Sequence, residues 1–352
     1  MKVILSIFLV FIISLGSYAQ AILKADGPGQ TYELIKSVFA PDENPLEPPD
    51  CSHPEFGRHI DEIWDSTLNE YVFRFFIHVV PDDDRCLYSD RQRNEIKIYD
   101  PSPATLKGFI GDSMVYKWRF KLDLGFQSSS SFTHIHQIKG VGGDEINMPL
   151  ITFTPRKGNP DRLQLRYAET TSQVTLVAFD LEKLKGKWVS VTECVRYNEE
   201  GSYSVTFTDY LTGEEIYHYE NNDLRMWRTG ASFFRPKWGI YRSLSHPEDL
   251  RDEELLFNEF YIKKFTATSI HDKRFELKRF FYPNPVHDYM IIRSDAGDEL
   301  NSVKIFDLNG KVVFVSENVN TRRIDISNLD KGFYFVELDK KGTTYYQKMI
   351  KD

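Results

Sequence analysis

Short runs of β-branched and aromatic residues recur between residues 51 and 268, and this repetition constrains the fold more than any other feature of the sequence. Such residues suit the pleated, half-buried surface of a strand. Residues 181–185 are the one short helix or turn that we expect in this region. Ten or more strands with so little helix predict an all-β sandwich or jelly roll. The runs cover residues 71–80, 94–98, 115–122, 132–139, 150–154, 162–167, 188–197, 203–208, 238–242 and 255–265.

The N-terminus has the features of an export signal. A lysine precedes an apolar run over residues 3–15, and small residues lead to a cleavage site after Ala19. A transmembrane anchor is the alternative, for which the run is short. Export permits disulfides. Of the three cysteines, Cys51 and Cys86 flank one predicted strand hairpin and form the pair that we expect, whereas Cys194 lies in a strand and is expected to be a free, buried thiol.

The composition divides the rest of the chain into four parts. Residues 20–50 form a separate N-terminal segment, and its proline-rich stretch, 41–49, is expected to be extended or looped. Residues 51–269 form the main β domain, 270–279 a charged linker, and 280–352 a small β-sandwich. Within this last part, Asn309-Gly310 between two alternating runs predicts a hairpin.

The C-terminal part carries four phrases in a specific order. They are Phe-Tyr-Pro-Asn-Pro-Val at 281–286, the hairpin sequence at 303–313 around Asn309-Gly310, Ile-Asp-Ile-Ser-Asn-Leu at 324–329, and Gly-Phe-Tyr-Phe-Val at 332–336. This order resembles the type A sorting domain of the type IX secretion system of Bacteroidetes. The resemblance implies a cargo protein whose tail is recognised, and usually removed, at the outer membrane. We therefore expect the type IX machinery as a partner and a secreted or cell-surface location.

The charge balance limits the class of ligand. The 52 acidic residues exceed the 44 basic ones, and a net charge of −8 gives no general attraction for nucleic acid. A polyanionic ligand therefore needs a local basic site. Three strand-borne clusters could form one, at residues 91–97, 132–140 and 235–242.

Strand alternation assigns faces within these clusters. The first cluster places Arg91, Arg93, Glu95 and Lys97 on one face. The third places Lys237, Gly239 and Tyr241 together, and the glycine leaves room for a ligand. For the second cluster two registers remain open: one presents His134 with His136, and the other presents Gln137 with Lys139.

Together the clusters fit β-elimination on a uronic-acid polysaccharide. Removal of the C5 proton places charge beside a carboxylate, so that carboxylate must first be neutralised. Arg93 could do this, together with His136, Gln137 or Lys139. Tyr241 could act as both base and acid where both proton transfers occur on one side of the sugar. Where they occur on opposite sides, His136 would be the base and Tyr241 the acid.

The three clusters also resemble, in the same order, the strand motifs of the jelly-roll alginate-lyase-like family. Residues 93–97, Arg-Asn-Glu-Ile-Lys, are similar to the family's Arg-x-Glu-Leu-Arg strand, and Lys-Trp-Gly-Ile-Tyr at 237–241 is similar to its Lys-Ala-Gly-x-Tyr strand. His-Ile-His at 134–136, or Gln-Ile-Lys at 137–139, resembles its Gln-Ile-His strand. The resemblance implies a concanavalin-like β-jelly-roll with a concave sheet for an anionic glycan, Arg93 as carboxylate binder and Tyr241 as acid or base. His134 and Arg242 depart from the alginate pattern, which favours a glucuronan or ulvan lyase.

These arguments select twelve site residues and imply no required cofactor. No redox or nucleotide cofactor is implied, and no Cys-x-x-Cys or clustered Cys/His set indicates zinc, although a structural Ca²⁺ is left open. We expect a monomer that binds an anionic polysaccharide. The predicted catalytic residues are Tyr241, His136, Arg93 and Lys139, and the predicted substrate-binding residues are Glu95, His134, Gln137, Lys237, Trp238, Arg242, Arg156 and Arg166.

Other functions are less well supported by the sequence. A non-catalytic glycan-binding module of the same fold is the main alternative, and it would bind polymer without forming products. A glycoside hydrolase ranks lower because no paired-carboxylate phrase lies on one strand. A serine hydrolase ranks lower still because no Gly-x-Ser-x-Gly turn occurs.

Overall fold

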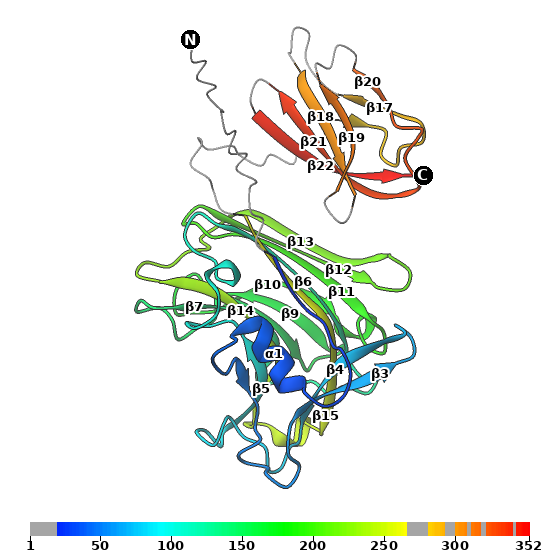
Figure 1. Ribbon diagram of the computed structural model, residues 1–352. Helices are drawn as coiled ribbons and strands as arrows, with labels where there is room; N and C mark the ends of the chain where they lie inside the picture. Colours follow the sequence, from blue (N-terminus) through cyan, green and yellow to red (C-terminus); the bar gives the residue numbers. More distant parts are fainter. Residues whose placement is uncertain (1–19, 266–280, 293–299, 308–310, 318–321, 341–342) are drawn as a thin grey trace, which may run out of the picture. The chain divides into compact units, whose positions relative to one another are not determined.

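A computed structural model describes residues 20–265, 281–292, 300–307, 311–317, 322–340 and 343–352 (Figure 1). The chain forms two compact units, Met1–Ala267 and Thr268–Asp352. The predicted signal at 1–19 and the predicted linker at 270–279 lie outside the described residues. Within the described ranges, every helix is too short or too polar to cross a bilayer.

The first unit contains an eight-stranded antiparallel sheet. Its strands are amphipathic, and their apolar side chains alternate with polar ones that point away from the core. In spatial order the sheet consists of β13 (Glu215–Leu224), β12 (Gly201–Asp209), β11 (Val189–Arg196), β6 (Ser113–Lys121), β15 (Glu253–Phe265), β4 (Glu70–Ile77) and β3 (Ile60–Asp65), with β1 (Gln20–Leu23) also paired to β15.

A second sheet of seven strands completes the sandwich. In the part of the chain that the structure describes, three short 3-10 helices join strands, η1 (Ala104–Leu106), η2 (Leu181–Lys183) and η3 (Pro247–Asp249), and η2 is the short helix predicted at 181–185. The all-β jelly-roll sandwich predicted from the sequence is therefore confirmed. In spatial order the seven-stranded sheet consists of β10 (Val174–Asp180), β9 (Arg162–Tyr167), β8 (Ile151–Arg156), β7 (Thr133–Val141), β14 (Phe233–Ser243), β5 (Arg91–Lys97) and β2 (Leu46–Glu47).

The hydrophobic core lies between the two sheets and is rich in aromatic rings. Trp118 on β6 stacks on Phe153 on β8 with 6.0 Å between ring centroids. Trp238 on β14 packs at 5.0 Å from Phe260 on β15. Each pair joins one sheet to the other, so aromatic contacts of this kind fix the sandwich. The remaining face of the seven-stranded sheet points away from this core and carries its polar residues.

The N-terminal segment at 20–50 is part of the sandwich rather than a separate lead-in. Helix α1 (Thr31–Phe39) buries Tyr32, Ile35 and Phe39, whose spacing places them on one helical face. Phe39 stacks on Trp238 with 6.0 Å between centroids. Strands β1 and β2 pair with β15 and β5. The proline-rich stretch contains only the two-residue edge strand β2.

The cysteines follow the predicted pairing, with one difference. Cys51 and Cys86 form a disulfide with 6.1 Å between their Cα atoms, as predicted. Cys194 is free, also as predicted, but its side chain is exposed rather than buried. The alternation of β11 explains this, because Glu193 and Val195 on either side point into the core.

The second unit is a small β-sandwich with its own core, as expected. Its buried residues include Val303, Ile305, Val336 and Met349. Strands β18 (Leu300–Phe306) and β19 (Val312–Glu317) pair as the two arms of the predicted hairpin, whose turn lies outside the described residues. One sheet contains β16 (Phe281–Tyr282), β17 (Tyr289–Ile292) and β20 (Arg323–Asp325), and the other contains β19 (Val312–Glu317), β18 (Leu300–Phe306), β21 (Gly332–Lys340) and β22 (Thr343–Lys351).

Candidate active site

The three sequence clusters lie on adjacent strands, with β14 between β5 and β7 (Figure 1). Tyr241 on β14 is the register partner of Arg93 on β5 and of His134 on β7. Lys237 is similarly placed between Lys97 and Gln137. We call the side of the seven-stranded sheet that bears these residues and points away from the core the charged face. The sheet therefore unites side chains that are distant in sequence, such as Arg91 and Tyr241, which are 150 positions apart.

A register shift between β14 and β7 decides the ambiguous faces of the second cluster. The shift falls between Trp238 and Tyr241 on β14. As a result Ile135 and His136 both point into the core, whereas His134, Gln137 and Lys139 lie on the charged face. The charged face therefore matches neither of the two predicted registers in full. It combines His134 from the first pair with Gln137 and Lys139 from the second.

His136 is the main correction to the predicted site. Its side chain is fully buried, and its Nε2 lies 3.0 Å from Oε1 of Glu193 on the opposite sheet. The rings of Trp118 and Trp238 lie 5.2 and 5.6 Å from its ring. A polymer on the charged face cannot reach this imidazole, so His136 is not available as the base.

Trp238 and Arg242 are also removed from the predicted substrate-binding set. Trp238 is a fully buried core residue that alternates with Lys237 along β14. Arg242 is 1% exposed, and it donates from Nε to Gln92 at 2.8 Å and from Nη1 to the backbone carbonyl of Arg251 at 2.8 Å. Both residues have structural roles, because the ring of Trp238 and the guanidinium of Arg242 are directed away from the charged face.

Tyr241 is surrounded by positive charge. Arg91 donates from Nη1 to the Tyr241 hydroxyl at 3.1 Å. The guanidinium carbon of Arg93 lies 3.7 Å from the centroid of the Tyr241 ring. The rings of Phe132 and His134 complete the surroundings at 4.9 and 5.9 Å. The phenol of Tyr241 therefore has one cation at its oxygen and a second against its ring.

Arg93 is held in place by three carboxylates. Asp84 accepts from Nε at 2.9 Å and from Nη2 at 3.2 Å. Nη1 donates to Glu95 at 2.6 Å and to Glu47 at 3.3 Å. These contacts use four of the five N–H groups of a guanidinium. The fifth, on Nη2, remains for a ligand, and the plane of the side chain is fixed against Tyr241.

Buried ion pairs underlie this arrangement. Glu95 is fully buried, with the Lys237 ammonium 2.5 Å away, and it also accepts a hydrogen bond from the amide of Gln137. The same ammonium lies 2.6 Å from Glu47, which also binds Lys97 at 2.8 Å. Burial is the largest influence and opposes ionisation of both glutamates, but the combined attraction of Lys237 and Arg93, with Lys97 in the case of Glu47, outweighs it, and the pKa of each lies below its ordinary value. Glu95, Lys237 and Gln137 therefore support the site from below.

The lowered pKa values of Glu47 and Glu95 predict loss of stability in acid. The unfolded chain takes up protons at the ordinary glutamate pKa of 4.5, whereas the folded chain binds them only at lower pH. The unfolded state thus binds more protons, and the free energy of unfolding should fall as the pH drops below about 4.5. Urea unfolding of the protein across this range measures the slope.

A Glu47→Gln variant isolates the contribution of this carboxylate. It should have a shallower dependence of unfolding free energy on pH, since one proton-binding group is gone. Glu199→Gln, at an exposed position, is the matched control and should leave the slope unchanged. Identical slopes for the Glu47 variant and the unmodified protein would contradict the assignment.

His134 is neutral at physiological pH. Its Nδ1 lies 2.6 Å from the Thr154 hydroxyl, which leaves Nε2 to meet a ligand. Burial lowers the pKa of His134 to about 3, and the cations Arg156 and Arg93 add to this effect against the opposing pull of Glu95. This imidazole can accept or donate a hydrogen bond but carries no charge of its own.

Two cations on the charged face have no partner among the described residues. Lys139 on β7 and Arg235 on β14 are register partners. Neither makes an ion pair within the described ranges, and Nε and Nη1 of Arg235 are buried without a hydrogen bond. Burial, with repulsion from Arg235, lowers the pKa of Lys139. Unpartnered buried N–H groups cost free energy, so this pair is suited to an anionic ligand.

The predicted residues Arg156 and Arg166 extend the positive charge across β8 and β9. Arg156 donates to the Ser130 carbonyl at 2.6 Å, and its Nε is buried without a partner. Arg166 contacts neutral groups, donating to Gln173 at 3.1 Å and to Gln164 at 3.0 Å. Arg235 was missed by sequence reasoning, although its position two residues before Lys237 places it on the same face.

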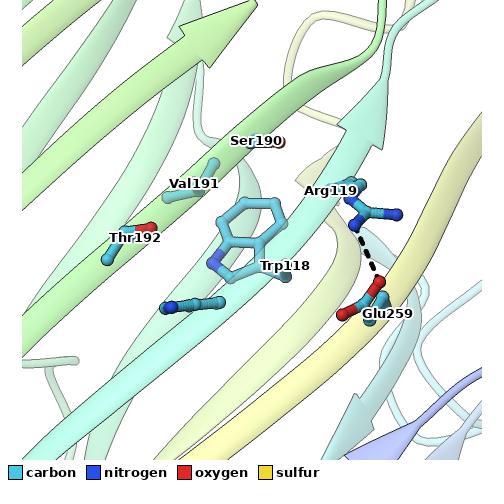
Figure 2. A pocket seen from close by; sticks show the side chains of 7 residues that line it. Trp118, Arg119, Ser190, Val191, Thr192 and Glu259 are labelled. Carbon is cyan, nitrogen blue, oxygen red and sulfur yellow. Dashed lines mark ion pairs between the residues drawn. The ribbon is translucent and has the colours of Figure 1, made fainter. Parts of the chain in front are cut away.

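A separate pocket of about 180 Å³ lies on the other sheet. Figure 2 shows it between β6, β11 and β15, with an ion pair of 2.8 Å between Arg119 and Glu259. Its polar lining residues alternate with Trp118 and Val191, which belong to the core. The pocket is therefore on the opposite side of the sandwich from Tyr241.

Comparison with known proteins identifies the C-terminal unit. Residues 280–352 match the family of secretion system C-terminal sorting domains. The protein is therefore an all-β jelly-roll protein that carries a type IX sorting domain, which directs it to the cell surface or the extracellular space. No curated protein matches the chain.

Comparison with solved structures finds several lyases that are similar to this chain at low sequence identity. The endo-β-1,4-glucuronan lyase from Trichoderma reesei is 15% identical, with a TM-score of 0.41, over 58% of this chain and 85% of that one. The marine alginate lyase from Aplysia kurodai is 15% identical, with a TM-score of 0.46, over 68% and 97%. An alginate lyase from Pseudomonas aeruginosa is 15% identical, with a TM-score of 0.41, over 62% and 96%.

Proposed function

We propose that the protein is a secreted polysaccharide lyase that cleaves a uronic-acid-containing polysaccharide by β-elimination. One observation carries this proposal: Tyr241 receives a hydrogen bond from Arg91 and stacks on Arg93, on a face that also holds unpaired cations. A phenol in such surroundings can give up its proton and take it back. The cations nearby suit a substrate that is itself negatively charged.

In this mechanism Tyr241 transfers both protons. The phenolate removes the C5 proton of the uronate, and the electron pair left on carbon forms the C4–C5 double bond. The bond between C4 and the glycosidic oxygen breaks at the same time. That oxygen takes the proton from the Tyr241 phenol, which regenerates the phenolate and leaves an unsaturated uronate end.

The substrate carboxylate must be neutralised while the C5 proton leaves. The remaining N–H of Arg93 can supply this charge, whereas Lys139 lies beside Arg235 and is placed to bind another acidic group of the polymer. His134 offers Nε2 for a further hydrogen bond. Donors that are already fixed before reaction stabilise developing negative charge more than mobile ones do, because they need no reorganisation.

The distribution of cations favours a polymer with repeated acidic groups, of which glucuronan and ulvan are the first candidates. Arg235 and Lys139 form one subsite for an acidic group. Arg156 and Arg166 lie beyond His134 on the following strands. Several acidic groups along one chain could contact these cations together. An isolated sugar acid would use only one of them.

The test is a panel of polyuronates that includes ulvan, glucuronan and alginate. Cleavage by this mechanism raises ultraviolet absorbance, because each event creates a double bond conjugated to a carboxylate. A glycan-binding module of the same fold would retain polymer in affinity electrophoresis and produce no absorbance. Absence of both signals on every polymer would contradict lyase and binding functions alike.

Replacement of Arg235 by methionine should weaken polymer binding. The change removes the charge and keeps much of the volume, and loss of a charge-assisted hydrogen bond of about 1.5 kcal/mol corresponds to roughly a tenfold rise in KM. The kcat should stay close to its original value, because Arg235 is six residues from Tyr241 along β14. Initial rates over a range of polymer concentrations separate the two parameters.

Arg196→Met is the control for this variant, since Arg196 is exposed on β11 in the other sheet. It should leave KM unchanged. Equal KM values for the Arg235 variant and this control would exclude a subsite for an acidic group at Arg235.

A further inference from the structure

Four metal-binding side chains converge at one edge of the sandwich, although they are dispersed in sequence. His53 follows the disulfide residue Cys51, and His59 immediately precedes β3. His78 immediately follows β4, and Asp82 lies in the loop between β4 and β5. Each offers one ligand atom, and these four atoms all lie within 4.8 Å of one another.

The imidazole nitrogens surround the Asp82 carboxylate. Nδ1 of His53 lies 3.0 Å from Oδ1, and Nε2 of His59 lies 3.2 Å from the same oxygen. Nδ1 of His78 lies 3.1 Å from Oδ2. The side chains of His59 and Asp82 are fully buried. Three nitrogens and one carboxylate form a set that suits four-coordinate Zn²⁺, with bonds of about 2.0–2.2 Å.

The groups behind these side chains also fit a metal site. Nδ1 of His59 lies 2.9 Å from Asp50, so its Nε2 is the nitrogen that faces the cluster. Asp50 in turn accepts from the Tyr32 hydroxyl at 2.9 Å. The backbone N–H of His78 donates to Oδ2 of Asp82 at 2.7 Å. A carboxylate that orients a histidine from behind is the usual support of a metal-bound imidazole.

We propose that His53, His59, His78 and Asp82 bind one Zn²⁺ ion in a structural site. Four protein ligands leave no open position for substrate, which distinguishes this site from a catalytic zinc. Nitrogen ligands disfavour Ca²⁺, which prefers oxygen. The Tyr241 site is not part of this proposal, which stands whether or not the protein is a lyase.

The proposed ion would stabilise the loop that holds Arg93. The carbonyl of Asp82 accepts from the Gln92 amide at 2.8 Å, and the carbonyl of Asp83 accepts from the backbone N–H of Arg93 at 3.2 Å. Asp84, two residues after the proposed ligand Asp82, binds the Arg93 guanidinium. A metal bond at Asp82 therefore acts on the same short loop that orients the cation beneath Tyr241.

Metal uptake by the full exported chain, purified without a polyhistidine tag, tests the proposal. After treatment with a chelator, the protein is titrated with Zn²⁺, and elemental analysis should give one ion per chain. Excess Ca²⁺ should not displace it. Replacement by Co²⁺ should produce the visible absorption of a four-coordinate, nitrogen-bound ion. The Tm should rise with Zn²⁺ concentration, because the ion binds the folded state.

The variants His53→Ala and His78→Ala should lose the bound ion and the rise in Tm. Both side chains are partly exposed, so these changes disturb the core less than a change at His59. His246→Ala, at an exposed histidine on the same unit, is the control and should bind one ion. If either cluster variant fails to fold, the Co²⁺ spectrum of the unmodified protein decides the question. Failure of the unmodified protein to take up Zn²⁺ or Co²⁺ would overturn the proposal and leave a metal-free network of imidazoles and carboxylates.

Discussion

A Tyr241→Phe variant should still bind the polymer but should lose roughly 10²- to 10⁴-fold in kcat, the usual contribution of a positioned proton-transfer group. The change removes one oxygen and keeps the ring that packs between Phe132 and Arg93. Among the described residues, the hydrogen bond from Arg91 is the only one that the change removes. Initial rates of absorbance increase, together with affinity electrophoresis on the same polymer, measure turnover and binding separately.

A second tyrosine provides the control for this experiment. Tyr99 follows β5, is partly exposed, and has the ammonium of Lys97 at 4.8 Å from its ring centroid. Tyr99→Phe should leave both kcat and binding unchanged. An undiminished kcat for the Tyr241 variant would exclude Tyr241 as the proton-transfer group, and a rise in KM alone would mean that it only binds substrate.

An Arg93→Ala variant should lose both activity and stability. Two carboxylates, on Asp84 and Glu95, are fully or almost fully buried and would lose an ionic partner. Removal of one member of a buried ion pair typically costs about 3–5 kcal/mol of unfolding free energy. The cation against the Tyr241 ring would also be lost. Urea unfolding and lyase rates on the same preparation follow both effects.

Two further variants separate the catalytic effect from the structural one. Arg93→Lys keeps the charge but cannot form the forked contacts of a guanidinium, so kcat should fall while part of the stability returns. Arg85 pairs with Asp84 and Glu47 but does not contact Tyr241. Arg85→Ala should therefore lower stability and leave kcat nearly unchanged. Equal loss of kcat in the Arg85 and Arg93 variants would show that Arg93 acts only through the fold.

Strand alternation was sufficient to predict much of the charged face. On β5 it placed Arg91, Arg93, Glu95 and Lys97 together, and the structure has them on one side. The pattern succeeded because β5 keeps a regular register with β14, so each second residue points the same way. The same rule, applied to Trp238 between Lys237 and Gly239, would have placed its indole in the core.

The faces of β7 could not be predicted by alternation. An extra residue on β14 shifts the register opposite Ile135, which places His136 in the core and Gln137 on the charged face. Such a shift depends on the pairing of two strands about one hundred residues apart, and nothing in the local sequence of either strand signals it.

The partners of the site residues were also beyond local reasoning. Asp84 and Glu47 lie in a loop and an edge strand, and they reach Arg93 only when the sheet is complete. The same holds for His53, His59 and His78, which no short motif connects. Their positions depend on tertiary structure, in which strand ends that are distant in sequence become neighbours.

The anchoring of Arg93 by three carboxylates has an entropic consequence. A free arginine side chain has about 2 kcal/mol of rotamer entropy to lose when it becomes fixed. Here that loss accompanies folding, since Asp84, Glu95 and Glu47 immobilise the guanidinium before any ligand arrives. An incoming polymer therefore meets a cation of set orientation, and the ordering of this side chain adds little to the entropic cost of its association.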